Sequence, residues 1–138
     1  MGNPPLMSGA KEAVGEVLRA GVPSVLVTGS GQASILERLA ADYPEAFKLR
    51  VTAHDVIHGK PDPEPYLKGM EMAGVDNTHA VAIDNAPLGV ESASRAGAFT
   101  IGVRTGPIPA ETLAAAGADI VVSSMAECAQ ILIFLFHR

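Results

Sequence analysis

Three short stretches of this sequence carry side chains that could together hold a phosphate group and a divalent cation. Thr28 ends an apolar run and precedes Gly29, so a hydroxyl and free backbone amides would face phosphate oxygens where a helix begins. Lys60 stands between a glycine and a proline, and its ammonium could offset the charge of a phosphoryl group. Asp84 ends a second apolar run, and Mg²⁺ prefers one or two carboxylates with phosphate and water. These residue types indicate phosphoryl chemistry.

Each of these residues also has a purely structural interpretation. Thr28 and Gly29 suit an ordinary tight turn, and taken alone that interpretation is favoured. Lys60 could be a solvated loop lysine, but the surrounding prolines stiffen the loop and lower the entropy cost of holding its side chain in place. Asp84 could cap the helix that follows it, although Asn85 could do so equally well and leave Asp84 available to a ligand.

Two other reactive groups are interpreted as structural. His54 and His58 have the spacing of the zinc-protease pattern, but that pattern needs a helix and a glutamate between them. Here the stretch follows a predicted strand and leads into a proline-rich loop. Cys128 has no histidine close to it in the sequence and is interpreted as a core thiol.

Residues 29–34 partly resemble a dinucleotide-binding fingerprint. Ser34 occupies the place of the third glycine, and Asp55 is a candidate for the acid that binds the ribose. This hypothesis leaves Lys60 and Asp84 without roles, so a dinucleotide-binding domain stays the third choice of function.

Length and composition limit the class of protein. At 138 residues and a net charge of −5, with acids and bases interspersed, the chain suits one domain and lacks the basic stripe of a nucleic-acid binder. Its single cysteine, and an amino-terminal stretch unlike a signal peptide, favour the cytoplasm. The longest apolar run, Ile131–Phe136, is far shorter than the about 20 residues of a membrane-spanning helix. We expect no contact with nucleic acid or membrane.

Apolar runs alternate with amphipathic stretches along the whole chain, without hairpin signals between the runs. This pattern predicts parallel strands joined by helices, an α/β fold. The strands are expected at 24–28, 49–53, 80–84, 99–103 and 120–122, and the helices from Ser8 to Gly21, up to Asp42, from Pro63 or Pro65 to Gly74, at 88–96 and 108–116, and from Met125 onward. Ligands of such sheets bind beyond the carboxyl ends of the strands, where Thr28 and Asp84 would lie.

The motifs also resemble a known family. Thr28-Gly29-Ser30, then residues 59–66 (GKPDPEPY), then residues 83–90 (IDNAPLGV) have the order and spacing of the haloacid dehalogenase superfamily, in its branch of sugar-phosphate phosphatases and β-phosphoglucomutase. The resemblance runs from about residue 7 to residue 125. It implies a Rossmann-like three-layer α/β/α core and a Mg²⁺-dependent phosphatase or phosphomutase for a small phosphate ester such as a sugar phosphate.

The same resemblance implies a role for each site residue. Thr28 and the Gly29 amide would bind the phosphoryl oxygens, and Lys60 would offset charge, so that Thr28 and Lys60 are the catalytic candidates. Asp84, together with Asn85, would hold Mg²⁺. The family usually has a second acid where this chain has Asn85, and its loss should weaken Mg²⁺ binding, although an amide oxygen can still accept a metal or a water.

The family's nucleophile has no counterpart in this sequence. The resemblance implies an aspartate in an Asp-x-Asp pattern that ends an amino-terminal strand, and the pattern does not occur here. In the family that strand lies between the Thr28 strand and the Asp84 strand. We therefore expect one incomplete core domain over residues 1–138, without nucleophile strand or cap and inactive by itself. A missing amino-terminal segment or a second copy of the chain would complete it.

Two other arrangements would avoid unpaired strand edges, which are costly when buried. The Thr28 and Asp84 strands could pair directly, or the run Ile131–Phe136, which is partly β-branched, could supply a strand. The alternative function is a non-catalytic module that binds phosphate or a nucleotide.

Overall fold

The computed structural model describes residues 9–28, 38, 41–104 and 107–136. Ser8, residues 29–34 and most of the helix expected up to Asp42 lie outside these ranges. The described helices and strands are α1 (Ala10–Ala20), β1 (Val25–Val27), β2 (Leu49–Val51), the short 3₁₀ helix η2 (Ala53–Asp55), α3 (Glu64–Ala73), the short 3₁₀ helix η3 (Asn77–His79), β3 (Val81–Asp84), α4 (Pro87–Arg95), β4 (Phe99–Val103), α5 (Ala110–Ala115), β5 (Ile120–Val122) and α6 (Met125–Phe136).

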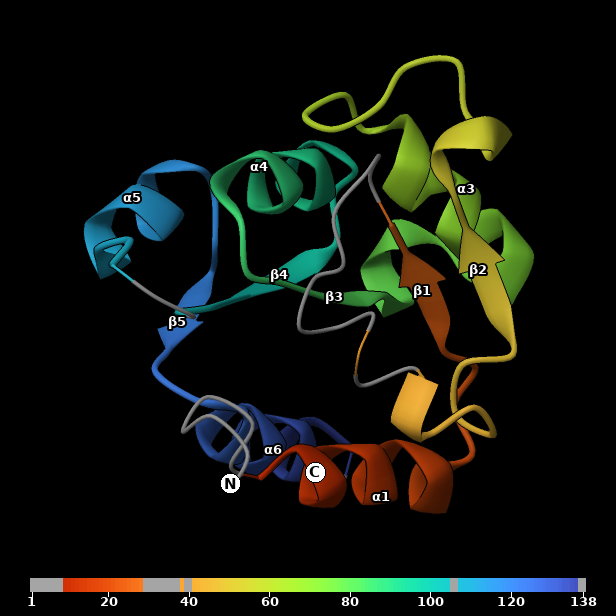
Figure 1. The fold of residues 1–138 in the computed structure, drawn as a ribbon, viewed down its shortest axis with the longest axis vertical. Coiled ribbons are helices and arrows are strands. Elements are labelled where there is room, and N and C mark those ends of the chain that lie inside the picture. Colours follow the sequence, from red (N-terminus) through yellow and green to blue (C-terminus); the bar gives the residue numbers. More distant parts are fainter. Residues whose placement is uncertain (1–8, 29–37, 39–40, 105–106, 137–138) are drawn as a thin grey trace.

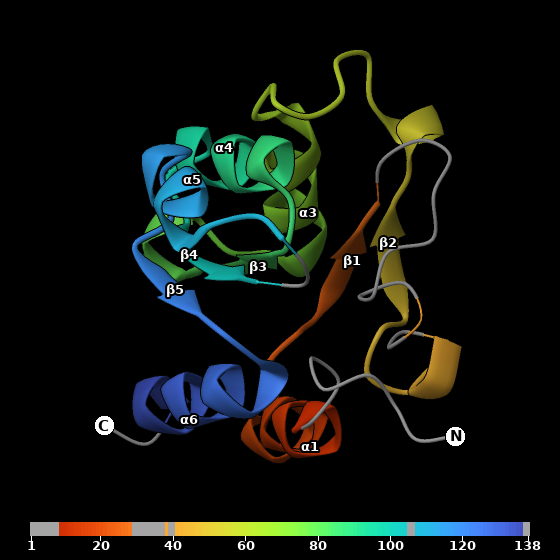
Figure 2. The same ribbon diagram turned by 60° about the vertical axis from the view of Figure 1, so that its left-hand side comes forward.

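The elements form three layers with the strands in the middle (Figures 1 and 2). Helices α3, α4 and α5 cover one face, and α1 and α6 lie side by side on the other. One buried apolar cluster joins α1 and α6 to β4 and β5, while a second fills the space between α3, α4 and β3. The predicted α/β three-layer architecture is confirmed.

All strand pairs are parallel, but they form two separate sheets. One sheet has the order β1–β2 and the other the order β3–β4–β5. Direct pairing of the strand before Thr28 with the strand that ends at Asp84 is therefore wrong for this structure. The division falls between β1 and β3.

The free edge of β1 faces away from β2. The Thr28 N–H donates to the Val51 carbonyl (2.9 Å), which places the backbone groups of Thr28 on the β2 side. Backbone groups of successive strand residues alternate between the two sides, so those of Val25 and Val27 point the other way. The Val27 carbonyl indeed accepts a hydrogen bond from Lys60 Nζ (3.2 Å) instead of from β2.

The alternation of backbone groups also shows which edge of β3 is free. The Phe99 N–H donates to the Ala80 carbonyl (3.1 Å), so even-numbered residues of this segment bond to β4. The backbone groups of Val81 and Ile83 then point away from β4. On the side that faces the other sheet, each sheet thus has an edge without a strand partner among the described strands.

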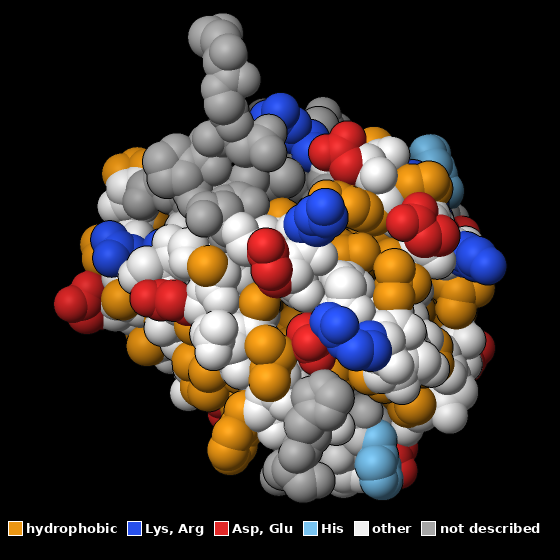
Figure 3. Space-filling view, turned by 90° about the horizontal axis from the view of Figure 1, so that it is seen from below, with side chains coloured by type: hydrophobic (Ala, Val, Ile, Leu, Met, Phe, Trp, Pro, Cys, Tyr) orange, Lys and Arg blue, Asp and Glu red, His pale blue; other side chains and the backbone are white. Residues whose placement is uncertain are grey.

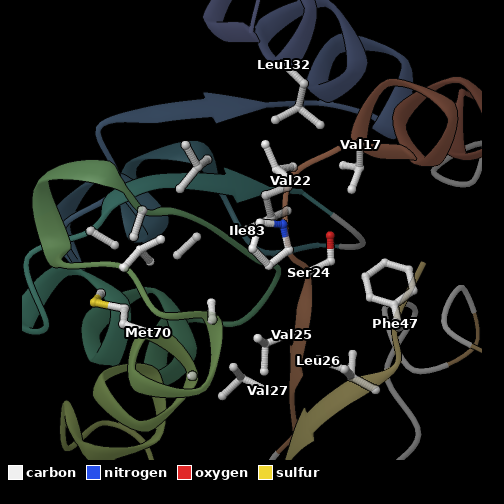
Figure 4. Close-up of a pocket in the computed structure, with 18 of the residues that line it drawn as sticks. Val17, Val22, Ser24, Val25, Leu26, Val27, Phe47, Met70, Ile83 and Leu132 are labelled. Carbon is white, nitrogen blue, oxygen red and sulfur yellow. The ribbon is translucent and has the colours of Figure 1, made fainter. Parts of the chain in front are cut away.

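An apolar cavity of about 300 Å³ lies between the two sheets (Figure 4). Strands β1 and β3 contribute valines and an isoleucine, α3 contributes Met70 and α6 contributes Leu132. Figure 4 shows Val25, Val27 and Ile83 around this space. The cavity marks the space between the strand edges as wide enough for further apolar side chains.

Glycines end the first two described α-helices as the sequence predicts. Gly21 and Gly74 adopt left-handed conformations (φ 68° and 74°), which glycine tolerates without strain. Gly9 occupies the N-cap position of α1, so the described helix begins at Ala10 where the sequence predicts a start at Ser8. Helix α3 begins at Glu64, between the two prolines expected to start it.

Helix α6 confirms the helix predicted from Met125 onward, and it excludes the alternative in which Ile131–Phe136 supplies a strand. The buried residues Met125, Cys128, Ala129 and Leu132 recur at helical spacing, and α6 packs with them against α1 and the sheet. Burial raises the pKa of the Cys128 thiol to about 12, which agrees with a core cysteine.

None of the described helices combines the length and the apolarity needed to cross a membrane. Figure 3 views the molecule from the side of α1 and α6, where acidic, basic and apolar side chains alternate over the described surface.

Candidate functional site

Lys60 brings the two sheets together at one edge. Its Nζ donates to the Asp84 carboxylate (Oδ2, 2.9 Å) and to the Val27 carbonyl at the end of β1 (3.2 Å). Because one ammonium reaches the last residue of β1 and the last residue of β3, both strands end at the same edge. The structure thus brings together two of the residues that the sequence singled out, with the Lys60 side chain only 18% exposed.

The loop that carries this lysine is anchored by hydrogen bonds. The Glu64 carboxylate accepts from the N–H groups of Ile57 (2.8 Å) and His58 (3.0 Å), which lowers the pKa of Glu64. The Asp62 carboxylate accepts from the Glu64 N–H (2.9 Å), and the Ser92 hydroxyl on α4 donates to the Asp62 carbonyl (2.6 Å). The ammonium is therefore presented from a fixed backbone.

Asp84 is buried at 3% exposure and is surrounded by donors. Its Oδ2 accepts from Lys60 Nζ and from the Tyr66 hydroxyl (2.6 Å), and its Oδ1 accepts from the Ala86 N–H (3.0 Å). A side chain at Gly89 on α4 would overlap the carboxylate, so glycine is needed there. An ionised carboxylate accepts about four hydrogen bonds, so the donors among the described residues leave one position on Oδ1 for another ligand.

Tyr66 is a site residue that the sequence analysis did not identify. It lies on α3 at 8% exposure, with its ring 5.4 Å from Lys60 Nζ. Burial, then the negative charge of Asp84 and the hydrogen bond to it, raise the pKa of Tyr66 well above its usual range. The sequence gives Tyr66 a place in the motif of residues 59–66 but no role, because no sequence pattern shows which distant carboxylate a phenol reaches.

The raised pKa of Tyr66 predicts a loss of stability in alkali. Since the folded protein keeps this proton at a pH where the unfolded chain releases it, the stabilisation is complete below about pH 10 and declines as pH rises further. We expect the free energy of unfolding to fall more steeply above that pH in the native protein than in Tyr66→Phe. Urea titrations at several pH values would measure this, with Tyr43→Phe as the control that should follow the native protein. Parallel curves for the native protein and Tyr66→Phe would contradict the prediction.

Thr28 lies at the same edge and is partly buried. Its hydroxyl donates to the Val51 carbonyl at 3.3 Å, a long bond that leaves the oxygen free to turn toward a ligand. Gly29 lies outside the described residues. Asn85 directly follows Asp84 and is half-buried.

The other metal and nucleotide candidates have structural roles. His54 lies in η2, whereas His58 lies beyond it with its Nδ1 3.4 Å from Glu64, so they do not share a helix. Asp55 forms a capping box with Thr52, and those hydrogen bonds lower the pKa of Asp55. Within the described ranges no three His, Cys, Asp or Glu residues cluster as a metal site.

Comparisons of the sequence and of the structure with known proteins point to the same family. The family model described as haloacid dehalogenase-like hydrolase matches residues 3–103. Validoxylamine A 7'-phosphate phosphatase of Streptomyces hygroscopicus subsp. limoneus is 33% identical over 124 residues, which cover 88% of this chain and 56% of that enzyme. A solved structure of a Bacteroides vulgatus protein assigned as a β-phosphoglucomutase has a TM-score of 0.81 and 38% identity, over 94% of this chain and 54% of its own.

A hydrolase of the same family from Deinococcus radiodurans R1 was solved with bound phosphate and sodium. It has a TM-score of 0.73 and 26% identity, over 91% of this chain and 58% of its own. The chain thus spans a little more than half the length of these three proteins. Since the family model covers most of the chain and the three-layer fold agrees, this protein belongs to the haloacid dehalogenase-like hydrolases, in the branch of the sugar-phosphate phosphatases and β-phosphoglucomutases.

Proposed function

We propose that this chain supplies the phosphate-holding part of a Mg²⁺-dependent phosphoryl-transfer site that acts on a small phosphate ester such as a sugar phosphate. The observation that carries the proposal is the ammonium of Lys60, held where the carboxyl ends of β1 and β3 meet. Phosphoryl transfer depends on positioning and on neutralising charge, which a fixed ammonium at a strand edge supplies. The phosphatase and the phosphoglucomutase that resemble the chain support this substrate class.

Lys60 has one N–H donor available for the phosphoryl group. An ammonium has three N–H donors, and within the described part of the chain Lys60 donates to two acceptors, Asp84 and the Val27 carbonyl. The third donor would bind a phosphate oxygen. Thr28 and the Gly29 amide would bind other oxygens at the carboxyl end of β1.

Asp84 and Asn85 would hold the Mg²⁺. The remaining acceptor position on Asp84 Oδ1 and the neighbouring amide oxygen are hard oxygen ligands of the kind Mg²⁺ takes, with phosphate and water completing its shell. The metal would neutralise charge on the phosphoryl oxygens. One carboxylate where the family usually has two predicts weak binding before phosphate is present.

The nucleophile would come from a strand in the gap between β1 and β3. A strand placed there would run parallel to both neighbours and end beside Lys60, where an aspartate could attack a bound phosphoryl group. We propose that a segment outside this sequence, of the kind the longer relatives possess, supplies this strand. By itself the chain would bind phosphate without turning over an ester.

Titration with inorganic phosphate in the presence of Mg²⁺ tests this proposal. The native chain is expected to bind phosphate saturably, and Lys60→Met to bind at least about tenfold more weakly, because a hydrogen bond to a charged group is lost. Lys68→Met, which removes an exposed lysine from α3, is the matched control and should bind normally. Phosphorus NMR would follow the binding. Equal affinity of the native chain and Lys60→Met for phosphate would refute the assigned site.

The alternative is a non-catalytic phosphate-binding module. The absence of an Asp-x-Asp pattern from the sequence favours it. Saturable phosphate binding that never leads to turnover, even when the missing strand is supplied, would support this alternative.

A further inference from the structure

The buried phenol of Tyr66 touches the same carboxylate oxygen as the ammonium of Lys60. The hydroxyl lies 2.6 Å from Asp84 Oδ2, and Lys60 Nζ lies 2.9 Å from it. Both bonds are charge-assisted and therefore stronger than bonds between neutral groups. Two donors thus bind Oδ2, and the Ala86 N–H binds Oδ1. Together these hydrogen bonds fix the orientation of the Asp84 carboxylate.

The ring of Tyr66 restrains the ammonium from a second direction. Nζ lies 5.4 Å from the ring centroid, within the range of a cation–π interaction. The ammonium is thus placed by the Asp84 oxygen, by the Val27 carbonyl and by the ring. Gly89 closes the opposite side, because a Cβ there would overlap the Asp84 carboxylate.

We propose that Tyr66 is a positioning residue, which fixes Asp84 and thereby directs the third N–H of Lys60 toward the bound phosphate. The assignment rests on the proposed phosphate site and adds to it a residue that never touches the ligand. Without the phenol hydroxyl, Oδ2 has only the ammonium as a described donor, so the carboxylate could rotate and draw a second N–H of Lys60 to itself. Fewer N–H groups would then face the phosphate.

The test compares Tyr66→Phe, which keeps the ring, with Tyr43→Phe, a change at the other tyrosine of the chain. The first readout is the ¹H–¹⁵N signal of the Lys60 ammonium, assigned by its loss in Lys60→Arg. We expect Tyr66→Phe to speed the exchange of the ammonium protons by about tenfold, the factor for one lost hydrogen bond to a charged group, and Tyr43→Phe to leave it unchanged. If Tyr66 had only a structural role, Tyr66→Phe would lower the stability of the fold without selectively changing the ammonium signal of Lys60.

The second readout is the affinity for inorganic phosphate, which should also fall by about tenfold in Tyr66→Phe. An unchanged ammonium signal, or an unchanged affinity where the native chain binds phosphate, overturns the positioning role. If the native chain binds no phosphate, the proposed function fails, and the ammonium signal alone decides whether Tyr66 positions Lys60. Tyr66→Met, which fills the space with a flexible apolar side chain and also lacks the hydroxyl, provides a second variant should Tyr66→Phe not fold. It should speed ammonium exchange in the same way.

Discussion

Replacing Lys60 with methionine is expected to lower the free energy of unfolding by about 3 kcal/mol, the lower end of the range for breaking a buried ion pair. The reason is that the Asp84 carboxylate, whose side chain is only 4% exposed, would lose its ammonium partner. Lys60 is itself partly exposed, so water would relieve some of the penalty. Urea unfolding followed by circular dichroism measures the change, with Lys68→Met as the control that should stay close to the native protein.

A double-mutant cycle separates the ion pair from the packing of the long side chain. Asp84→Asn removes the charge, so adding Lys60→Met to it should cost about 2 kcal/mol less than in the native protein, within the range for residues in contact. Strictly additive effects would mean that the contact between Lys60 and Asp84 contributes nothing to stability.

Filling the gap between β1 and β3 is expected to produce the second large effect. The part of the Streptomyces phosphatase that this chain does not match can be expressed separately and mixed with it. A strand bound in the gap would pair both free edges and bury the cavity of about 300 Å³. At a hundred times its dissociation constant, such a partner raises the free energy of unfolding by about 2.7 kcal/mol. If the mixture hydrolyses a sugar phosphate and neither part does so separately, the result would support an enzyme rather than a non-catalytic binding module.

Val25→Pro is the matched control for this experiment. Val25 begins β1, and its N–H faces the gap, away from β2. Proline is tolerated at the first residue of an edge strand, so the variant should keep its own stability. It should lose the shift caused by the added partner. A shift of the same size in Val25→Pro, or none in the native chain, would show that the partner does not bind at this edge.

Two strands show the best agreement between predicted and observed bounds. The bounds of β4 and β5 agree with the expectation, because each is a short apolar run set off by a glycine that ends the helix before it. Gly97 and Gly117 both adopt positive φ angles there. Local chemistry decides these boundaries, so the sequence contains enough information to place them.

The features that depend on distant contacts were harder to predict. The run Ile131–Phe136 suits either a strand or the end of the helix predicted from Met125 onward, and packing of the helix against α1 decides between them. The sequence also indicated Lys60 and Asp84 correctly as neighbours at the strand ends. It gave no indication of Tyr66, because a phenol and a carboxylate 18 residues apart are brought together only by α3 lying beside β3.

The divided sheet has a consequence for the motions of the molecule. Strands β1 and β2 bond to each other and pack mainly under α3, whereas β3, β4 and β5 pack under α4 and α5. Such contiguous groups open as separate cooperative units, so the backbone amides of β1 and β2 can exchange with solvent while the other sheet stays closed. Lys60 is a polar link across that boundary, bonded to one unit through Val27 and to the other through Asp84. An anion bound at Lys60 would therefore couple the opening of the two halves.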